Sequence, residues 1–146
     1  MIPAFDEEGY LPEGIHTATW SEVERRFASS ARRGWLLQGL AAALANLHGA
    51  GCRVVYLDGS LVTDKTVPND YDACWEASGV LPSLLDPVLL DFSEGRTKQK
   101  LKYRGELFPS SAVEGALAVS FLEFFQRRQD TGGRKGIIRI ELDTLS

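Results

Sequence analysis

Two groups of apolar residues with helical spacing dominate the first third of the chain. Thr19-Trp20-Ser21-Glu22 fits a capping box, and Val23 and Phe27 continue the spacing, which predicts a short helix ending near Phe27. Residues 32–48 are expected to form the clearest helix, because glycines follow it and its apolar stripe contains Leu36, Leu40, Leu44 and Leu47, broadened by Trp35, Leu37 and Ala43.

The strands are predicted from two different patterns. Residues 53–58 form an almost continuous apolar run, which is typical of a strand buried on both faces. Residues 70–77 alternate instead, so one face of the second strand is expected to carry Asp70, Asp72, Cys74 and Glu76. A short strand is expected over 105–109, ended by Pro109, and a final strand over 136–142.

The remaining segments are less regular. Residues 1–18 are rich in proline, glycine and acids and predict an extended arm that packs on the body. Residues 82–92 predict one or two helical turns interrupted by Pro87, residues 110–119 a loop, and residues 121–128 an aromatic helix or a strand. Residues 96–104 carry five basic residues at strict alternation, which leaves helix and strand both open. The whole chain, 1–146, is read as one α/β (α+β) domain.

Composition narrows the class of protein. With 146 residues, 44% of them hydrophobic, and a net charge of -4, the chain is typical of a globular domain that could bind a polyanion only through a local basic patch. No signal peptide and no run of ~20 apolar residues is evident, so a cytoplasmic protein without a membrane segment is expected. Cys52 and Cys74 have no metal or disulfide spacing and predict buried thiols. His16 and His48 have no visible catalytic partner.

The strongest chemical signal lies between residues 56 and 75. A glycine–serine turn, Gly59-Ser60, follows the apolar strand, and nine residues later Asp70 and Asp72 occupy alternate positions. On a strand, two such aspartates point to the same side about 6–7 Å apart and can reach a shared metal. A glycine turn lets backbone N–H groups approach a phosphate closely. The stretch therefore predicts a place where a metal and a phosphate meet.

This arrangement resembles the nucleotidyltransferase superfamily in a minimal bacterial form. The likeness rests on an apolar strand, Gly59-Ser60, and Asp70-Tyr71-Asp72, with the helix of residues 32–48 leading into the strand. Flanking phrases such as Gly105-Glu106-Leu107-Phe108-Pro109 are also similar to short uncharacterised bacterial proteins assigned to that fold. The resemblance implies a nucleotidyltransferase-like (polymerase beta-like) fold, a small mixed β-sheet flanked by helices.

The resemblance also implies roles for particular residues. Gly59 and Ser60 would hold the triphosphate of an NTP, with ATP as the first choice, and Asp70 and Asp72 would hold Mg²⁺ or Mn²⁺. The superfamily adds a third carboxylate from a later strand, for which Glu106 is the first choice and Glu141 and Asp91 are the fallbacks. Lys65 could meet a phosphate or be a solvated loop lysine. Asp58, just before the turn, is expected to be a structural acid.

Two functions follow as alternatives. The first is transfer of a nucleoside monophosphate to a hydroxyl of a protein, RNA or small molecule, with the acceptor unidentified. The second is a catalytically weak or inactive partner, such as an antitoxin or a regulatory nucleotide-binding module of a bacterial toxin–antitoxin or defence system. The small size favours a protein partner or a homo-oligomer that completes the acceptor site. Binding of nucleic acid through 96–104 is less favoured, because Tyr103 is the one aromatic residue in that run.

Overall fold

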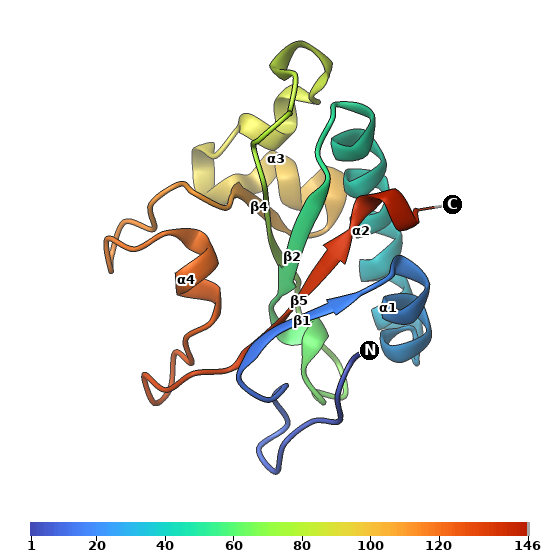
Figure 1. Ribbon diagram of the computed structural model, residues 1–146, viewed down its shortest axis with the longest axis vertical. Coiled ribbons are helices and arrows are strands. Elements are labelled where there is room, and N and C mark those ends of the chain that lie inside the picture. The colour runs from blue at the N-terminus through green and yellow to red at the C-terminus, as the bar shows by residue number, and fades with distance from the viewer. Residues whose placement is uncertain (146) are drawn as a thin grey trace.

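Five strands form one mixed sheet, in the order β1-β5-β2-β3-β4 (Figure 1). The computed structural model describes residues 1–145. Strand β2 is antiparallel to both of its neighbours, β3 and β5, whereas β1 pairs with β5 and β3 pairs with β4 in parallel. The strands are β1 Gly14–Ala18, β2 Val54–Asp58, β3 Asp72–Trp75, β4 Glu106–Pro109 and β5 Gly136–Glu141.

The main core lies between one face of this sheet and three helices, α1 Trp20–Phe27, α2 Ala31–Gly49 and α3 Ser93–Tyr103. Thr19 and Glu22 form the predicted capping box of α1. Every residue of β2 is buried, as its apolar run predicted, and the leucine stripe of α2 is fully buried against the sheet. The predicted fold class, a mixed α+β sheet with flanking helices, is confirmed at this level.

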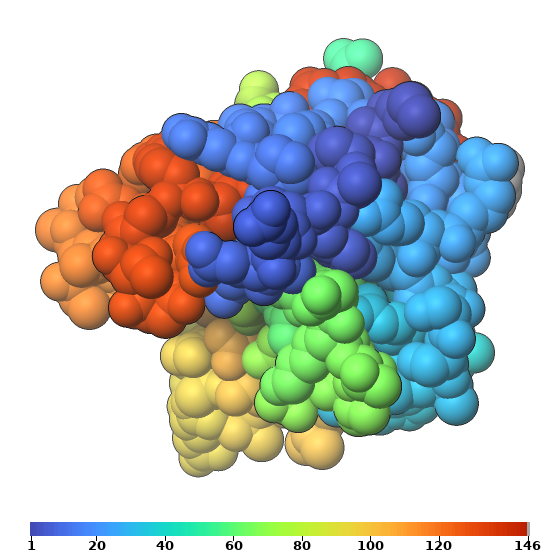
Figure 2. Space-filling model, turned by 90° about the horizontal axis from the view of Figure 1, so that it is seen from below, coloured from blue at the N-terminus to red at the C-terminus, as the bar shows by residue number. Residues whose placement is uncertain are grey.

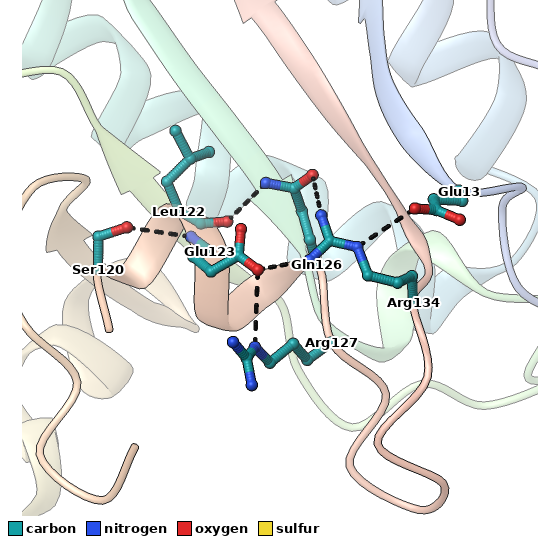
Figure 3. Close-up of polar contacts among 7 residues, drawn as sticks. All are labelled: Glu13, Ser120, Leu122, Glu123, Gln126, Arg127 and Arg134. Atoms are coloured by element: carbon teal, nitrogen blue, oxygen red, sulfur yellow. Dashed lines mark hydrogen bonds and ion pairs between the residues drawn. The ribbon is translucent and has the colours of Figure 1, made fainter. Parts of the chain in front are cut away.

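The opposite face of the sheet is covered by a smaller aromatic cluster. It forms around helix α4, Phe121–Phe125, and includes Tyr56, Cys74 and Phe108 from three strands. Arg134 holds this segment in place, because its guanidinium contacts Glu13 of the N-terminal arm as well as Glu123 and Gln126 of the α4 segment (Figure 3). In Figure 1 the α4 segment stands apart from the other helices, on the far side of the sheet. This face is therefore only partly covered.

Two predicted segments differ in the structure, and one that was left open is settled by it. The arm of residues 1–18 contains strand β1, which the local sequence does not indicate because its partner β5 is more than a hundred residues away. The second strand is shorter than predicted, since β3 begins at Asp72 and leaves Asp70 in the loop before it. The basic run, for which helix and strand were both open, lies on and beside α3: Lys98, Lys100 and Lys102 are helical, whereas Arg96 and the C-cap Arg104 have left-handed backbone conformations.

The predictions for the short turns and the cysteines are confirmed. Residues 82–92 form two 3-10 turns, Pro82–Leu84 and Pro87–Leu90, and both cysteines are buried and free. His16 contacts the carbonyl of Pro12 and His48 lies 3.4 Å from Asp143. Within residues 1–145, no helix has the length and apolar character needed to cross a membrane.

Candidate functional site: a row of carboxylates across the sheet

Three acids from three neighbouring strands lie in one row at the same end of the sheet. Asp58 on β2 is the register partner of Asp72 on β3, and Asp72 is in turn the partner of Glu106 on β4. Directly opposed residues share a face. The row therefore lies on the same face as Tyr56, Cys74 and Phe108, each of which is two residues away from an acid of the row on its own strand. Sheet pairing therefore gathers acids that are far apart in the sequence.

Asp58, at one end of the row, is buried and paired. Its Oδ1 accepts from Nζ of Lys135 at 2.7 Å, and the side chains are 6% and 14% exposed. Burial raises the pKa of Asp58 above its usual range, and the Lys135 ammonium opposes that rise. The interpretation of Asp58 as a structural acid fits this closed pair, whose partner lies 77 residues away in the chain and could not be predicted.

Glu106, at the other end, is held by two cations of α3. Its two oxygens accept separately, from Arg96 at 3.3 Å and from Lys100 at 3.0 Å. The predicted third carboxylate therefore opens β4 beside Asp72, as expected, but its charge is already balanced. The fallbacks lie elsewhere: Glu141 pairs with Arg139, and Asp91 with Lys98 and Ser93.

Asp70 and Asp72 are different, because neither forms an ion pair within residues 1–145. Burial, together with the nearby charges of Asp70, Asp58 and Glu106, raises the pKa of Asp72 to about 8, and the Lys135 ammonium opposes that rise. The Lys135 ammonium is paired with Asp58, so the acids around Asp72 outweigh the positive charge that would stabilise its ionised form. A cation bound at the middle of the row would thus relieve the most electrostatic repulsion.

The Gly59-Ser60 turn brings the end of β2 against the start of β3. Gly59 has a φ of +92°, and a Cβ atom there would lie 2.8 Å from the amide nitrogen of Asp72. The position requires glycine for backbone packing as well as for any ligand. The Ser60 hydroxyl accepts from the N–H groups of Asn69 and Asp70 at 3.0 and 3.3 Å, so it closes the loop that leads to Asp70.

Two arginines at the start of α2 fix this loop. The buried Arg33 guanidinium donates to the carbonyls of Leu61, Thr63 and Lys65 at 2.5, 2.7 and 2.7 Å. Arg32 donates to the carbonyls of Pro68 and Asn69. Basic residues at a helix start are unfavourable for the helix dipole, and the sequence alone does not show what offsets them here. Their role in holding the loop depends on contacts about thirty residues away in the chain.

An open cavity of about 650 Å³ lies over this part of the row. Its walls contain the predicted residues Gly59, Ser60, Lys65, Asp70 and Asp72, together with Lys135 and Tyr10. The N-terminal arm forms one rim, since the Gly9 carbonyl accepts from Asp64 and Glu8 pairs with Arg128. Figure 2 shows the arm lying between the loop of the 60s and the C-terminal segment.

Glu106 lies just beyond this cavity and lines two adjoining hollows. One, of about 310 Å³, also contains Asp72 and the rings of Phe108 and Phe121, which stack 4.0 Å apart. The other, of about 290 Å³, contains Asp70, Trp35 and several basic residues. Asp70, Asp72 and Glu106 therefore stand at the junction of three hollows.

The carboxylates are not arranged as a ready metal cage. Within residues 1–145, no group of three or more His, Cys, Asp or Glu side chains is close enough to hold a metal ion. The donors available beside the Gly59-Ser60 turn are the two aspartates, Asp70 and Asp72. Oxygen donors of this kind suit Mg²⁺ and Mn²⁺, and Mg²⁺ keeps several waters and needs only one or two carboxylates.

Comparison with known proteins identifies a family but no activity. No curated protein and no solved structure matches the chain significantly. The sequence matches a family of unknown function, DUF6932, over residues 3–141. That range includes the carboxylate row, the Gly59-Ser60 turn, and the arginines that fix the loop between them. The chain therefore belongs to the DUF6932 family.

Proposed function

We propose that this chain is a metal-dependent nucleotidyltransferase, which moves a nucleoside monophosphate from an NTP to a hydroxyl group. The observation that carries the proposal is the pair of unneutralised aspartates, Asp70 and Asp72, beside a glycine turn in an open cavity. The nucleotidyltransferase-like fold is part of the same proposal. It is supported by the order of elements, in which α2 leads into β2, the Gly59-Ser60 turn and β3, and β4 brings Glu106 next to Asp72.

The cavity offers both signs of charge that such a substrate needs. Lys65 and Lys135 line it on the side of the Gly59-Ser60 turn, where they can donate to the outer phosphates. Lys135 has three donors and uses one on Asp58, so it can contact both that carboxylate and a phosphate. ATP remains the first choice of nucleotide.

Asp70 and Asp72 are the residues that would hold Mg²⁺ or Mn²⁺. Their fit follows from the raised pKa of Asp72, since a divalent cation relieves the repulsion among Asp70, Asp72 and their neighbours. When bound, the metal neutralises charge on the phosphoryl oxygens and orients the attacking and leaving oxygens.

The chain's own residues supply the remaining roles. In the transfer, the acceptor oxygen forms a bond to the α-phosphorus, the bond to the β-phosphate bridge breaks, and pyrophosphate leaves. Glu106 is positioned to receive the proton of the acceptor hydroxyl, because a carboxylate has about four lone-pair sites and its two cations occupy two of them. Gly59 allows close approach of the backbone, while Arg32 and Arg33 keep Asp70 in place by fixing the loop.

One test uses labelled ATP, CTP, GTP and UTP with Mg²⁺ or Mn²⁺ and a cell lysate as the source of acceptor. We expect the wild-type protein to transfer label and Asp72→Asn to lose at least about a thousandfold of that activity, since metal stabilisation contributes several kcal/mol. Asp143→Asn is the matched control, because Asp143 is an exposed acid near the opposite end of β5. The proposal fails if the wild-type protein shows neither transfer nor metal-dependent nucleotide binding.

A second candidate, a nucleotide-binding module with little or no catalysis, has its own support. The Ser60 hydroxyl is engaged with its own loop, and Glu106 is neutralised by Arg96 and Lys100. Such a module would serve as an antitoxin or a regulatory partner. Metal-dependent nucleotide binding that is lost in Asp72→Asn, without transfer to any acceptor, would identify it.

A further inference from the structure

A basic and aromatic shelf lies directly beside the proposed metal aspartates. We define the Trp35 shelf as Arg32 and Trp35 of α2, Lys100 of α3, and Arg104, which ends α3. These residues line the hollow of about 290 Å³ that Asp70 and Glu106 also line. The shelf therefore opens onto the side of the row where an acceptor hydroxyl would meet Glu106.

Two cations of the shelf keep their charge available. The Cζ atoms of Arg32 and Arg104 lie 4.7 and 4.5 Å from the centroid of the Trp35 ring. Their hydrogen bonds go to neutral acceptors, the carbonyls of Pro68, Asn69 and Trp35 and the side chain of Gln38. Neither guanidinium pairs with a carboxylate among residues 1–145. In a chain of net charge -4, this is a local positive patch.

The aromatic member of the shelf is exposed. Trp35 is 42% exposed, whereas the other two tryptophans, Trp20 and Trp75, are 9% and 3% exposed. An exposed indole among guanidinium groups is the combination that single-stranded nucleic acids use, since bases stack on rings or guanidinium planes and cations meet the phosphates. The aromatic residue missing from the basic run is thus supplied by α2, while Tyr103 is buried.

We propose that the Trp35 shelf binds the 3′-terminal nucleotides of a single-stranded RNA. The binding itself depends only on the shelf, but its role as the acceptor site rests on the proposed transferase function. In that role the terminal 3′ oxygen bonds to the α-phosphorus of the NTP, pyrophosphate leaves, and the hydroxyl proton passes to Glu106. A phosphate-bearing chain fits better than a neutral acceptor, because Arg32 and Arg104 are not neutralised by neighbouring acids.

The position of Trp35 provides a direct test by fluorescence. The wild-type protein would be titrated, in EDTA and without NTP, with a short single-stranded oligoribonucleotide of mixed sequence. We expect saturable quenching of tryptophan emission that weakens with added salt, because phosphate contacts release counterions. Trp35→Phe should lose the quenching signal, since the other two indoles are buried.

Arg104→Asn is the variant that tests the cation. Asparagine tolerates the left-handed backbone of Arg104, which has a φ of 66°, so the end of α3 should remain folded. We expect about tenfold weaker binding and a salt slope smaller by about 0.7, the values for one lost phosphate contact to a single strand. Arg25→Asn removes an exposed arginine of α1 that does not line the hollow of the shelf, and this variant should bind as the wild type does.

The outcomes separate this inference from the proposed function. Absence of quenching, equal losses in Arg104→Asn and Arg25→Asn, or equal binding of poly-glutamate would overturn the shelf as an RNA site, whatever the protein does with NTP. RNA binding that depends on Arg104, in a protein that shows no metal-dependent NTP binding, would keep the RNA site and remove the transferase. Transfer of label to a protein but never to the oligonucleotide would overturn its role as acceptor.

Discussion

Asp58 and Glu106 stand at the ends of the carboxylate row and are paired, whereas Asp72 between them is not. Lys135 balances Asp58 in a nearly closed pair, and Arg96 and Lys100 balance Glu106 at a more open edge. Around Asp72 the charges of Asp70, Asp58 and Glu106 outweigh that of Lys135, and together with burial they raise its pKa to about 8. The fold thus neutralises the acids that flank the site and leaves the central ones for something else to neutralise.

The largest effect is expected from breaking the buried pair. Lys135→Met leaves Asp58 as a buried charge without its partner, and we expect the free energy of unfolding to fall by about 3–5 kcal/mol. The double variant Asp58→Asn/Lys135→Gln should recover most of this loss, because neither side chain is then charged. Urea unfolding of the three proteins measures the difference. Equal stability of the single and double variants would show that the pair does not matter.

A slightly smaller loss is expected when the loop that holds Asp70 is released. Arg33→Met removes the donors to the carbonyls of Leu61, Thr63 and Lys65, which should cost about 2–4 kcal/mol. Amide exchange should also become faster over residues 61–66 than in the rest of the chain. Arg25→Met, on the exposed side of α1, is the control and should change neither quantity. Unchanged exchange in the loop of Arg33→Met would contradict its role.

The raised pKa of Asp72 predicts that its contribution to the free energy of unfolding falls as pH rises, whereas the contribution of a paired acid increases. Its pKa is about 8 in the folded protein, against about 3.9 in an unfolded chain. Between these values the folded state holds a proton that the unfolded state has lost. The free energy of unfolding therefore falls as pH rises from about 4 to 8, by at most about 1.4 kcal/mol per pH unit.

Asp72→Asn should remove this contribution and be more stable than the wild type at pH 8.5 by at least about 2 kcal/mol, within a limit of about 5 kcal/mol set by the slope over about four pH units. At pH 4 the two proteins should differ little, because Asp72 is protonated in the folded state and still about half protonated in the unfolded chain. Urea unfolding at pH 4, 6 and 8.5 measures the slope. A pH profile identical to that of the wild type would mean that Asp72 is not destabilised in its ionised form.

The smallest effect on stability is expected at the open end of the row. Glu106→Gln removes an acid whose partners Arg96 and Lys100 are 34% and 52% exposed, so the free energy of unfolding should change by less than about 1 kcal/mol. Transfer activity should fall much more than stability, since Glu106 is the proposed proton acceptor. Full activity in a folded Glu106→Gln protein would assign that role to another group.

Much of the fold could be predicted from local pattern. The capping box of Thr19 and Glu22, the leucine stripe of α2 and the buried run of β2 depend on neighbours within a few residues, and all three were confirmed. Strand β1 was missed because its partner β5 lies at the other end of the chain. Trp35 was placed on the apolar stripe, yet it is 42% exposed. The spacing of apolar residues does not show which residue at the border of a broad stripe faces solvent.

The candidate site was predictable in its members but not in its balance of charges. Gly59, Ser60, Asp70 and Asp72 could be grouped because they lie close together in the sequence, and they line one cavity. Which acids are neutralised could not be read from the sequence, since Lys135 reaches Asp58 across 77 residues of chain. The role of Arg33 could not be read from the sequence either, because it depends on hydrogen bonds to a loop about thirty residues away.

Paramagnetic Mn²⁺ tests the central claim most directly, because it broadens the NMR signals of nuclei near its site. With Mn²⁺ and ATP, we expect amide signals of residues 58–60 and 70–72 to broaden first in the wild-type protein and in Asp143→Asn. In Asp72→Asn that selective broadening should be lost. Broadening centred on other acids, such as Glu7, Glu8 or Asp130, or an equal effect in Asp72→Asn, would show that the unpaired aspartates are not the metal site.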